Sequence, residues 1–252
     1  MPLINYILTL SLILMIVSGC REQPRDLSVV KKEESKKVNT GIKPEIVKDT
    51  DTNPEKVNKK IDQTKTNTVI DKEQWSDLEV DYEGFVMDIR YATANNFTKK
   101  VIYDCPKCLL RPSAAKALDE ANRHLTERFK VRIKLFDCYR PRPYQQRLWD
   151  IVPNASYVTP PAKGSMHSRG MAVDLTLVDE DGKELDMGTA FDFFGEEAHQ
   201  GYPKHSDAVK RNRYILRSTM EKYGFSPIRT EWWHFSYGGK NYPLSDFVWK
   251  CS

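Results

Sequence analysis

The feature that most constrains this chain is its division into three stretches of different composition. Residues 21–79 carry 13 Lys and Arg and 13 Asp and Glu, with Trp75 as their one aromatic side chain and Gly41 as their one glycine. So little apolar surface cannot offset the conformational entropy lost on folding. A solvated charged helix is the alternative, but Pro44 and Pro54 interrupt it. We therefore expect residues 21–79 to form a disordered charged tether with a root-mean-square span of roughly 40 Å.

An uncharged apolar run occupies residues 3–17 and is followed by Ser18-Gly19-Cys20. The run is slightly short for a membrane-spanning helix and ends in small residues, as a secretory signal does. The ending resembles a bacterial lipobox, in which the cysteine is lipid-modified and becomes the mature N-terminus. We therefore predict a lipoprotein-type signal peptide over residues 1–20, lipidation at Cys20, and an exported protein that is lipid-anchored to a bacterial membrane (periplasm or cell envelope). Because no Lys or Arg precedes the run, an uncleaved N-terminal anchor is the alternative.

The remaining stretch, residues 80–252, has the length of one domain. It carries 26 Lys and Arg against 22 Asp and Glu, so the formal charge of +4 belongs to it entirely. A dedicated nucleic-acid binder would show a basic stripe or a much higher isoelectric point, so nucleic acid is excluded as a partner. The length is enough for a single substantial hydrophobic core. The oligomeric state is left open.

Apolar spacing within residues 80–252 predicts helices and strands in mixed order. Helices are expected over residues 111–129, 144–149 and 207–223, and strands over residues 131–137, 171–178 and 225–235. These elements lack the regular strand–helix–strand alternation of a parallel sheet. We therefore predict an α+β domain, with a central antiparallel sheet flanked by helices.

Two short stretches concentrate side chains that can bind a metal. One contains His167 and Asp174, and the other contains Glu231 and His234. Two imidazoles and one carboxylate are a common ligand set for catalytic zinc and leave a fourth position for water. A lone His-x6-Asp pair is usually structural, but here polar groups recur inside two otherwise apolar strands, where an unpaired charge is costly. The pattern therefore predicts one Zn²⁺ per chain.

Taken together, the two stretches resemble the signature of the zinc D-Ala-D-Ala metallopeptidases. The matching pattern is Ser165-x-His167-x-x-Gly170-x-Ala172-x-Asp174 followed by Glu231-x-Trp233-His234. Within that group the chain is similar to the D-alanyl-D-alanine dipeptidases, the type found in vancomycin-resistance clusters. Further similar segments are residues 89–98, residues 187–192 and Asp137-Cys138-Tyr139-Arg140-Pro141, where Cys138 replaces the usual glycine. The resemblance implies the zinc D-Ala-D-Ala peptidase (Hedgehog-like) fold for residues 80–252.

The resemblance also implies which residues hold the metal and which one moves protons. His167, Asp174 and His234 would hold zinc. Glu231 would be the general base, taking a proton from the attacking water and delivering it to the leaving amine. A carboxylate can complete this transfer at neutral pH because zinc lowers the pKa of a bound water to about 7.

Three further residues receive roles from the same resemblance. Arg140 would stabilise the oxyanion of the tetrahedral intermediate, and its alternative is a structural salt bridge in a turn bounded by proline. Ser165 and Asp192 would contact the free ammonium of the substrate. Asp192 has an alternative role as the cap of a following helix.

The implied reaction is hydrolysis of the D-Ala-D-Ala dipeptide by a metal-activated water, in cell-wall peptide metabolism. The alternative is a zinc D,D-carboxypeptidase or endopeptidase that acts on peptidoglycan stem peptides, which an export signal favours. Residues 89–98 and 187–192 favour the dipeptidase. A non-catalytic binding protein is the third hypothesis, and the presence of Glu231 argues against it.

At least two of the four cysteines of residues 80–252 are expected to be paired in a disulfide if the protein is exported. The four are Cys105, Cys108, Cys138 and Cys251. An oxidising compartment allows two bridges among them, in any of three pairings. The sequence does not choose between these pairings.

Overall fold

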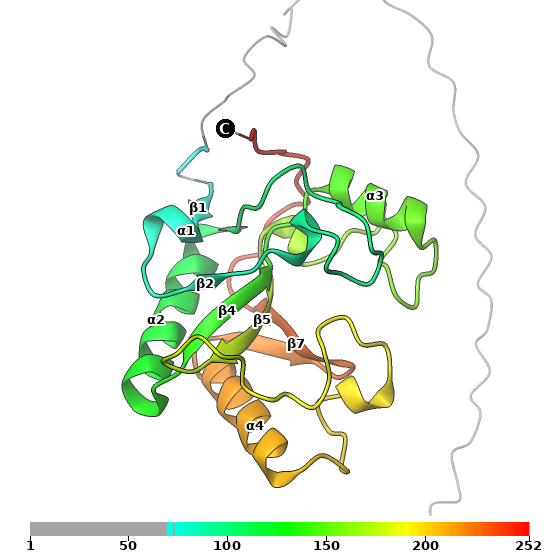
Figure 1. Ribbon diagram of the computed structural model, residues 1–252. Coiled ribbons are helices and arrows are strands. Elements are labelled where there is room, and N and C mark those ends of the chain that lie inside the picture. The colour runs from blue at the N-terminus through cyan, green and yellow to red at the C-terminus, as the bar shows by residue number, and fades with distance from the viewer. Residues whose placement is uncertain (1–69, 73, 252) are drawn as a thin grey trace, which may run out of the picture. The chain divides into compact units, whose positions relative to one another are not determined.

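A five-stranded sheet forms the centre of the fold in the computed structural model, which describes residues 70–72 and 74–251 (Figure 1). Its strands follow the order β2-β4-β5-β7-β6. Their bounds are Val86–Met87 for β2, Arg132–Asp137 for β4, Ala172–Val178 for β5, Phe225–Ile228 for β6 and Glu231–Tyr237 for β7. Neighbouring strands are antiparallel except β2 and β4, which form a parallel pair at one edge. The predicted α+β class is confirmed.

Two long helices pack beside each other and against the sheet. Helix α2 contacts β4 and α4, and α4 contacts β6, so both lie on the same side of the sheet (Figure 1). The helices are α1 at Leu78–Asp81, α2 at Pro112–Phe129, α3 at Arg142–Ile151 and α4 at Asp207–Lys222. Two short strands, β1 at Ser76–Asp77 and β3 at Leu109–Leu110, form a separate antiparallel pair. Among the described residues, no helix combines the length and the apolar character that crossing a membrane requires.

Local signals explain where the long helices begin. Pro112 occupies the first turn of α2, where its missing N–H costs nothing. In α4, the Ser206 hydroxyl accepts the Val209 N–H at 3.3 Å and so caps the first turn. A buried polar contact then ties α2 to the sheet, because the Asn122 side-chain oxygen accepts the Ile133 N–H at 2.8 Å.

The domain includes residues that the sequence assigned to the tether. Trp75 is only 2% exposed, and it lies between the Arg111 guanidinium (3.9 Å from the ring centre) and the Tyr139 ring (4.1 Å between centres). Leu78 is fully buried. The prediction of a tether is therefore wrong for residues 74–79. The average composition of the stretch does not show that its single aromatic side chain, Trp75, packs into the core. Ile70 also packs against the core, whereas residues 1–69, with the predicted signal peptide and most of the tether, lie outside the described residues.

Two disulfides select one of the three possible pairings. Cys105 is bonded to Cys251, and Cys108 is bonded to Cys138. The first bridge joins a surface loop to the C-terminal tail, whose Trp249 is buried. The second joins the residue before β3 to the residue after β4.

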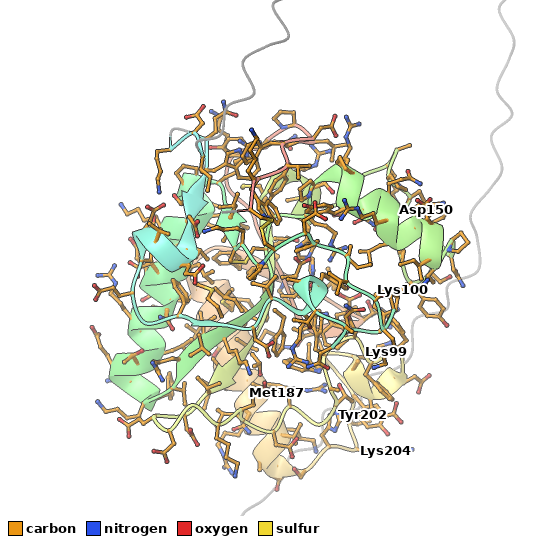
Figure 2. The ribbon with its side chains drawn as sticks, turned by 45° about the horizontal axis from the view of Figure 1, so that its top comes forward. Lys99, Lys100, Asp150, Met187, Tyr202 and Lys204 are labelled. Carbon is orange, nitrogen blue, oxygen red and sulfur yellow. A yellow bond between two sulfur atoms is a disulfide. The ribbon has the colours of Figure 1, made fainter. Side chains whose placement is uncertain are left out.

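A long connection between β5 and α4 completes the domain. Met187, Tyr202 and Lys204 mark its course in Figure 2. The side chain of Arg213 on α4 holds this connection by donating to three backbone carbonyls, those of Met187 (2.7 Å), Glu197 (2.9 Å) and His199 (2.9 Å). The connection is therefore anchored to α4 although it contains only one short helical turn, at Glu196–Ala198.

Candidate active site

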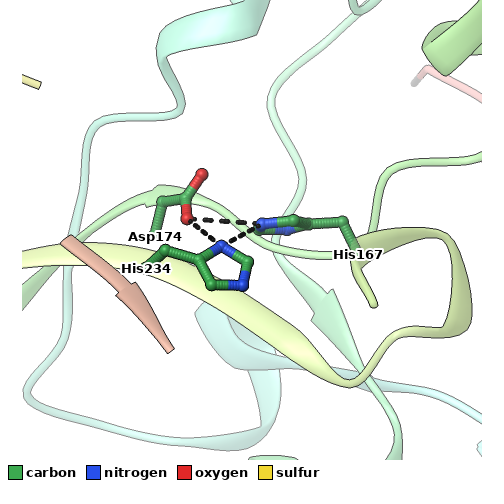
Figure 3. A group of neighbouring side chains, drawn as sticks. All are labelled: His167, Asp174 and His234. Carbon is green, nitrogen blue, oxygen red and sulfur yellow. Dashed lines mark hydrogen bonds and ion pairs between the residues drawn. The ribbon is translucent and has the colours of Figure 1, made fainter. Parts of the chain in front are cut away.

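Three side chains that can bind a metal converge where β5 and β7 pair (Figure 3). Asp174 on β5 lies directly opposite His234 on β7 in the sheet register. His167 comes from the single helical turn His167–Arg169, which immediately precedes β5. The sheet therefore places two of the groups, and the chain entering β5 places the third.

The spacing of these atoms fits a single zinc ion. His234 Nδ1 lies 2.9 Å from Asp174 Oδ1, and His167 Nε2 lies 3.1 Å from His234 Nδ1 and 3.3 Å from Asp174 Oδ1. Tetrahedral zinc with bonds of about 2.0–2.1 Å places neighbouring ligand atoms about 3.3 Å apart. Two imidazoles and a carboxylate are also the donor set that catalytic zinc uses. The site therefore fits the ion in both spacing and chemistry.

Each imidazole is oriented by a hydrogen bond from its other nitrogen. His167 Nδ1 lies 2.7 Å from the Cys138 carbonyl, which can only accept, so this nitrogen carries the proton and Nε2 is free for a metal. His234 Nε2 lies 3.0 Å from the Ser236 hydroxyl, which leaves Nδ1 facing the other two ligands. Ser236 was not among the residues expected at the site. Its position two residues after His234, on the same face of the strand, is a signal that could have found it.

Gly170 allows the chain to turn from His167 into β5. Its φ of +70° lies in the left-handed region, which side chains other than glycine adopt rarely. A Cβ added there would lie 2.4 Å from the Trp75 ring. Glycine is therefore required at position 170 by the backbone conformation and by the lack of room for a side chain. It supplies no functional group to the site.

The seven residues expected at the site lie in one cavity. Its volume is about 380 Å³. The residues expected from the sequence that line it are Arg140, Ser165, His167, Asp174, Asp192, Glu231 and His234. Residues far apart in the sequence are therefore brought to one place, with the aromatic side chains of Tyr157 and Phe194 also in the wall.

Negative charge is concentrated in this cavity. Burial raises the pKa of Asp192 and of Glu231, and the nearby charge of Asp174 raises both further. Burial opposes ionisation of Asp174 as well, but His167 and His234 outweigh it and hold the pKa of Asp174 well below its usual value. A bound cation would relieve the repulsion among the three carboxylates, which again fits a metal at this position.

Arg140 is held rigidly within the cavity. Its Nε and Nη2 donate to Asp137 at 3.0 and 2.5 Å, and its Nη1 donates to Gln145 at 3.0 Å. Its Nη2 also lies 4.0 Å from Asp174. The expected alternative, a structural salt bridge, is thus present, but the guanidinium still lines the cavity and can act on a bound molecule. Asp137 is fully buried and was missed as a site residue, although it lies in the same matching segment as Arg140.

Asp192 and Ser165 lie at the cavity wall in different settings. Asp192 is half-buried with a φ of +60°, and its carboxylate accepts the Tyr91 hydroxyl at 3.2 Å. No helix begins at Asp192, so the alternative role as a helix cap is wrong. The Ser165 hydroxyl accepts the Ser168 N–H at 3.3 Å, which shapes the turn before His167. Tyr91 was quoted only as part of a matching segment, and the structure adds it to the site.

The His–Asp–His set, with Glu231 in the same cavity, is an arrangement that suits a zinc metallopeptidase. Comparison with known proteins narrows the class: the family model described as D-Ala-D-Ala dipeptidase matches residues 71–249, and the chain belongs to this family. It is 39% identical over 176 residues to the D-alanyl-D-alanine dipeptidase of Escherichia coli (strain K12), an alignment that covers 69% of this chain and 91% of that protein. The corresponding enzyme of Enterococcus faecalis (strain ATCC 700802 / V583) is 33% identical over 190 residues, covering 67% of this chain and 94% of that protein.

Two solved structures show weaker likenesses. One is the vancomycin-resistance D,D-pentapeptidase VanY in complex with Zn(II), at 15% identity and a TM-score of 0.36, covering 52% of this chain and 74% of that one. The other is the vancomycin-resistance D,D-dipeptidase VanXYg in complex with a D-Ala-D-Ala phosphinate analogue, at 20% identity and a TM-score of 0.34, covering 53% of this chain and 52% of that one.

Proposed function

We propose that this protein is a zinc-dependent dipeptidase that hydrolyses D-Ala-D-Ala in cell-wall peptide metabolism. One observation carries the proposal: the cavity that contains the metal set His167, Asp174 and His234 also contains Glu231 and Arg140. These are the groups that peptide hydrolysis requires, namely a metal site, a base and a cation for the developing oxyanion. Membership of the family and the similarity to named D-alanyl-D-alanine dipeptidases support the substrate.

Glu231 moves the proton in this mechanism. Zinc, when bound by the three ligands, supplies a Lewis acid and lowers the pKa of water to about 7. The Glu231 carboxylate accepts a proton from the attacking water and donates it to the leaving amine. Its position at the first residue of β7, three residues before His234, places base and metal site on the same strand. General acid–base catalysis of this kind contributes about 10²–10⁴-fold to rate.

Arg140 stabilises the charge that develops on the scissile carbonyl oxygen. Its guanidinium is fixed by Asp137 and Gln145 before substrate arrives, so it does not have to reorganise during the reaction. Burial alone would lower the pKa of Arg140, but the nearby carboxylate of Asp137 raises it. The guanidinium therefore stays charged. The salt bridge and the catalytic role are therefore compatible.

Asp192 and Ser165 bind the free ammonium of the dipeptide. Asp192 has no basic partner within hydrogen-bond distance among the described residues, and the Tyr91 hydroxyl is its one side-chain donor there. A substrate ammonium supplies the missing positive charge. An N-acylated stem peptide has no such charge and would leave the carboxylate uncompensated in a half-buried wall, which favours the dipeptidase over the carboxypeptidase or endopeptidase alternative.

The two substrate classes can be separated by a direct assay. Release of D-alanine is measured from D-Ala-D-Ala and from an acylated tripeptide that ends in D-Ala-D-Ala, at equal concentrations and with zinc present. We expect turnover of the free dipeptide and little of the acylated peptide. Turnover of the acylated peptide alone would reverse the assignment in favour of the carboxypeptidase.

We also propose that the protein is exported and lipid-anchored through Cys20. The apolar run of residues 3–17 with its lipobox-like ending supports this. The disulfides Cys105–Cys251 and Cys108–Cys138 support export, because such bridges persist in oxidising compartments. Labelling of growing cells with a fatty acid tests the proposal: the wild-type chain is expected to incorporate the label and Cys20→Ser is not. Equal labelling of both chains would contradict lipidation at Cys20.

A further inference from the structure

The segment that follows β4, residues 138–140, orients the metal site from outside the sheet. Asp137 is the last residue of β4 with a partner in the sheet register. Beyond it, the Cys138 carbonyl accepts the His167 Nδ1–H at 2.7 Å, and the Arg140 N–H donates to the His167 carbonyl at 3.2 Å. The position of His167 therefore depends on backbone that the sheet does not fix.

A disulfide fixes that backbone instead. Cys138 is bonded to Cys108, and the next residues of the two segments are also joined, because the Leu109 carbonyl accepts the Tyr139 N–H at 2.9 Å. Cys108 is itself anchored, since its carbonyl accepts the Leu78 N–H at 2.9 Å and β3 follows it directly. Both cysteines are buried, at 1% exposure for Cys108 and none for Cys138. The bridge thus links a firmly held segment to the one that carries the acceptor of His167.

We propose that the Cys108–Cys138 disulfide is a positioning element of the metal centre. It holds residues 138–140 in place before the metal binds, so that the Cys138 carbonyl orients His167 and the guanidinium of Arg140 stays in the cavity. The physical reason is that a hydrogen-bond acceptor can orient an imidazole only if its own backbone is fixed, and the end of a strand is where backbone opens most easily. This inference rests on the proposed function, because it assumes that His167 binds zinc.

The second disulfide provides a matched control. The Cys105–Cys251 bridge joins a loop to the C-terminal tail, and the Cys105 carbonyl accepts the Trp249 indole N–H at 3.3 Å. Neither cysteine of this bridge has a hydrogen bond to His167, Asp174 or His234 among the described contacts. Its removal opens a disulfide whose cysteines make no hydrogen bond to the metal ligands, while the tail keeps its own contact with the His167 turn, because the Ser168 carbonyl accepts the Ser245 N–H at 2.9 Å.

The first test measures zinc affinity by competition with a chelator, using the full chain. The variants are Cys108→Ala/Cys138→Ala and, as the control, Cys105→Ala/Cys251→Ala. Changes to groups that orient a metal ligand typically weaken binding 10–100-fold. We expect that loss for the first variant and a clearly smaller change for the control, whose cysteines do not orient a metal ligand. Wild-type affinity in the first variant, or equal losses in both, would overturn the proposal.

The second test does not require any variant to fold. Amide hydrogen exchange of Tyr139 and Arg140 is measured by NMR in the metal-free wild-type chain. If the bridge preforms the segment, these amides are protected as strongly as those of β4. Exchange as fast as in the exposed turn at residues 180–182 would overturn the proposal, because the segment would then be ordered only by the metal.

The two tests also separate this inference from the proposed function. A wild-type chain that binds no zinc contradicts the proposed function, and the exchange experiment on metal-free protein still decides whether the segment is ordered before the metal binds. A wild-type chain that binds zinc, together with a bridge variant of equal affinity, contradicts the inference and leaves the dipeptidase assignment intact.

Discussion

The site is built from two regions that hold their functional groups in different ways. Asp174 and His234 belong to the central strands β5 and β7 and face each other in the sheet register. His167, Arg140 and Asp192 belong to turns and connections outside the strands. Backbone hydrogen bonds between strands hold the first region in place. Individual side-chain contacts and the Cys108–Cys138 disulfide hold the second.

This difference separates two of the metal ligands from the third ligand, His167, and from the groups that position the substrate. The sheet supplies a rigid pair of ligands whose spacing depends on many backbone hydrogen bonds. The groups outside the sheet each depend on one or two side chains that hold them in place, which we call braces. Asp137 is the brace of Arg140, and Arg213 is the brace of the connection that carries Asp192. Changing a brace should therefore disturb one function at a time, and the predictions below test this from the largest expected effect to the smallest.

The largest effect is expected from the brace of Arg140. Asp137→Ala leaves a buried guanidinium without its carboxylate, and breaking a buried ion pair in this way costs about 3–5 kcal/mol in the free energy of unfolding. Urea denaturation of the metal-free protein measures it. The control, Asp246→Ala, breaks the exposed ion pair with Arg142 and should cost less than about 1 kcal/mol, since the Asp246 side chain is 58% exposed. Similar small losses in both variants would show that Arg140 does not depend on this brace.

The next effect concerns the connection between β5 and α4. Arg213 is 6% exposed, and Arg213→Ala leaves three backbone carbonyls without their donor. Hydrogen bonds to charged groups contribute about 1.5–3 kcal/mol each, so loosening the Asp192 wall should raise KM for D-Ala-D-Ala by about tenfold or more. Zinc affinity should stay the same, and the control Arg217→Ala, one turn further along α4, should leave KM unchanged. If zinc and substrate affinity fall together in Arg213→Ala, the two regions are not independent.

A smaller effect is expected within the sheet itself. Ser236→Ala removes the hydrogen bond that orients His234, which should weaken zinc binding by about tenfold, the lower end of the usual range, while KM of the zinc-loaded enzyme stays unchanged. The control is Ser226→Ala on β6, because Ser226 is exposed and pairs with Ser236 in the register. Metal titration of both variants is the measurement, and equal affinities would show that the hydroxyl does not orient the ligand.

The parts of the molecule that local sequence determines could be predicted. Apolar periodicity marked α2, β4, β5 and α4, and motif spacing identified His167, Asp174, Glu231 and His234 as neighbours. These signals are local, because a few adjacent residues are enough to specify a strand or a turn.

Most of the supporting contacts could not be predicted, because they join residues that are distant in the sequence. The guanidinium of Arg213 has partners that only the folded chain brings near. Asp137 is the exception, because its partner Arg140 is only three residues away. Cysteine spacing allowed three pairings, and Trp75 looked like part of a polar stretch until its contact with Arg111 was visible. The parallel pairing of β2 with β4 could not be predicted either, because β2 is only two residues long and shows no apolar periodicity.

The central claim, metal-assisted hydrolysis with Glu231 as the base, is tested most directly by Glu231→Gln. This substitution keeps the size of the side chain and removes its ability to accept a proton. Zinc content and D-Ala-D-Ala hydrolysis are measured on the same preparation of the full chain. We predict wild-type zinc content and a hydrolysis rate lower by about 10²–10⁴-fold. Undiminished hydrolysis in the zinc-loaded variant would contradict the mechanism.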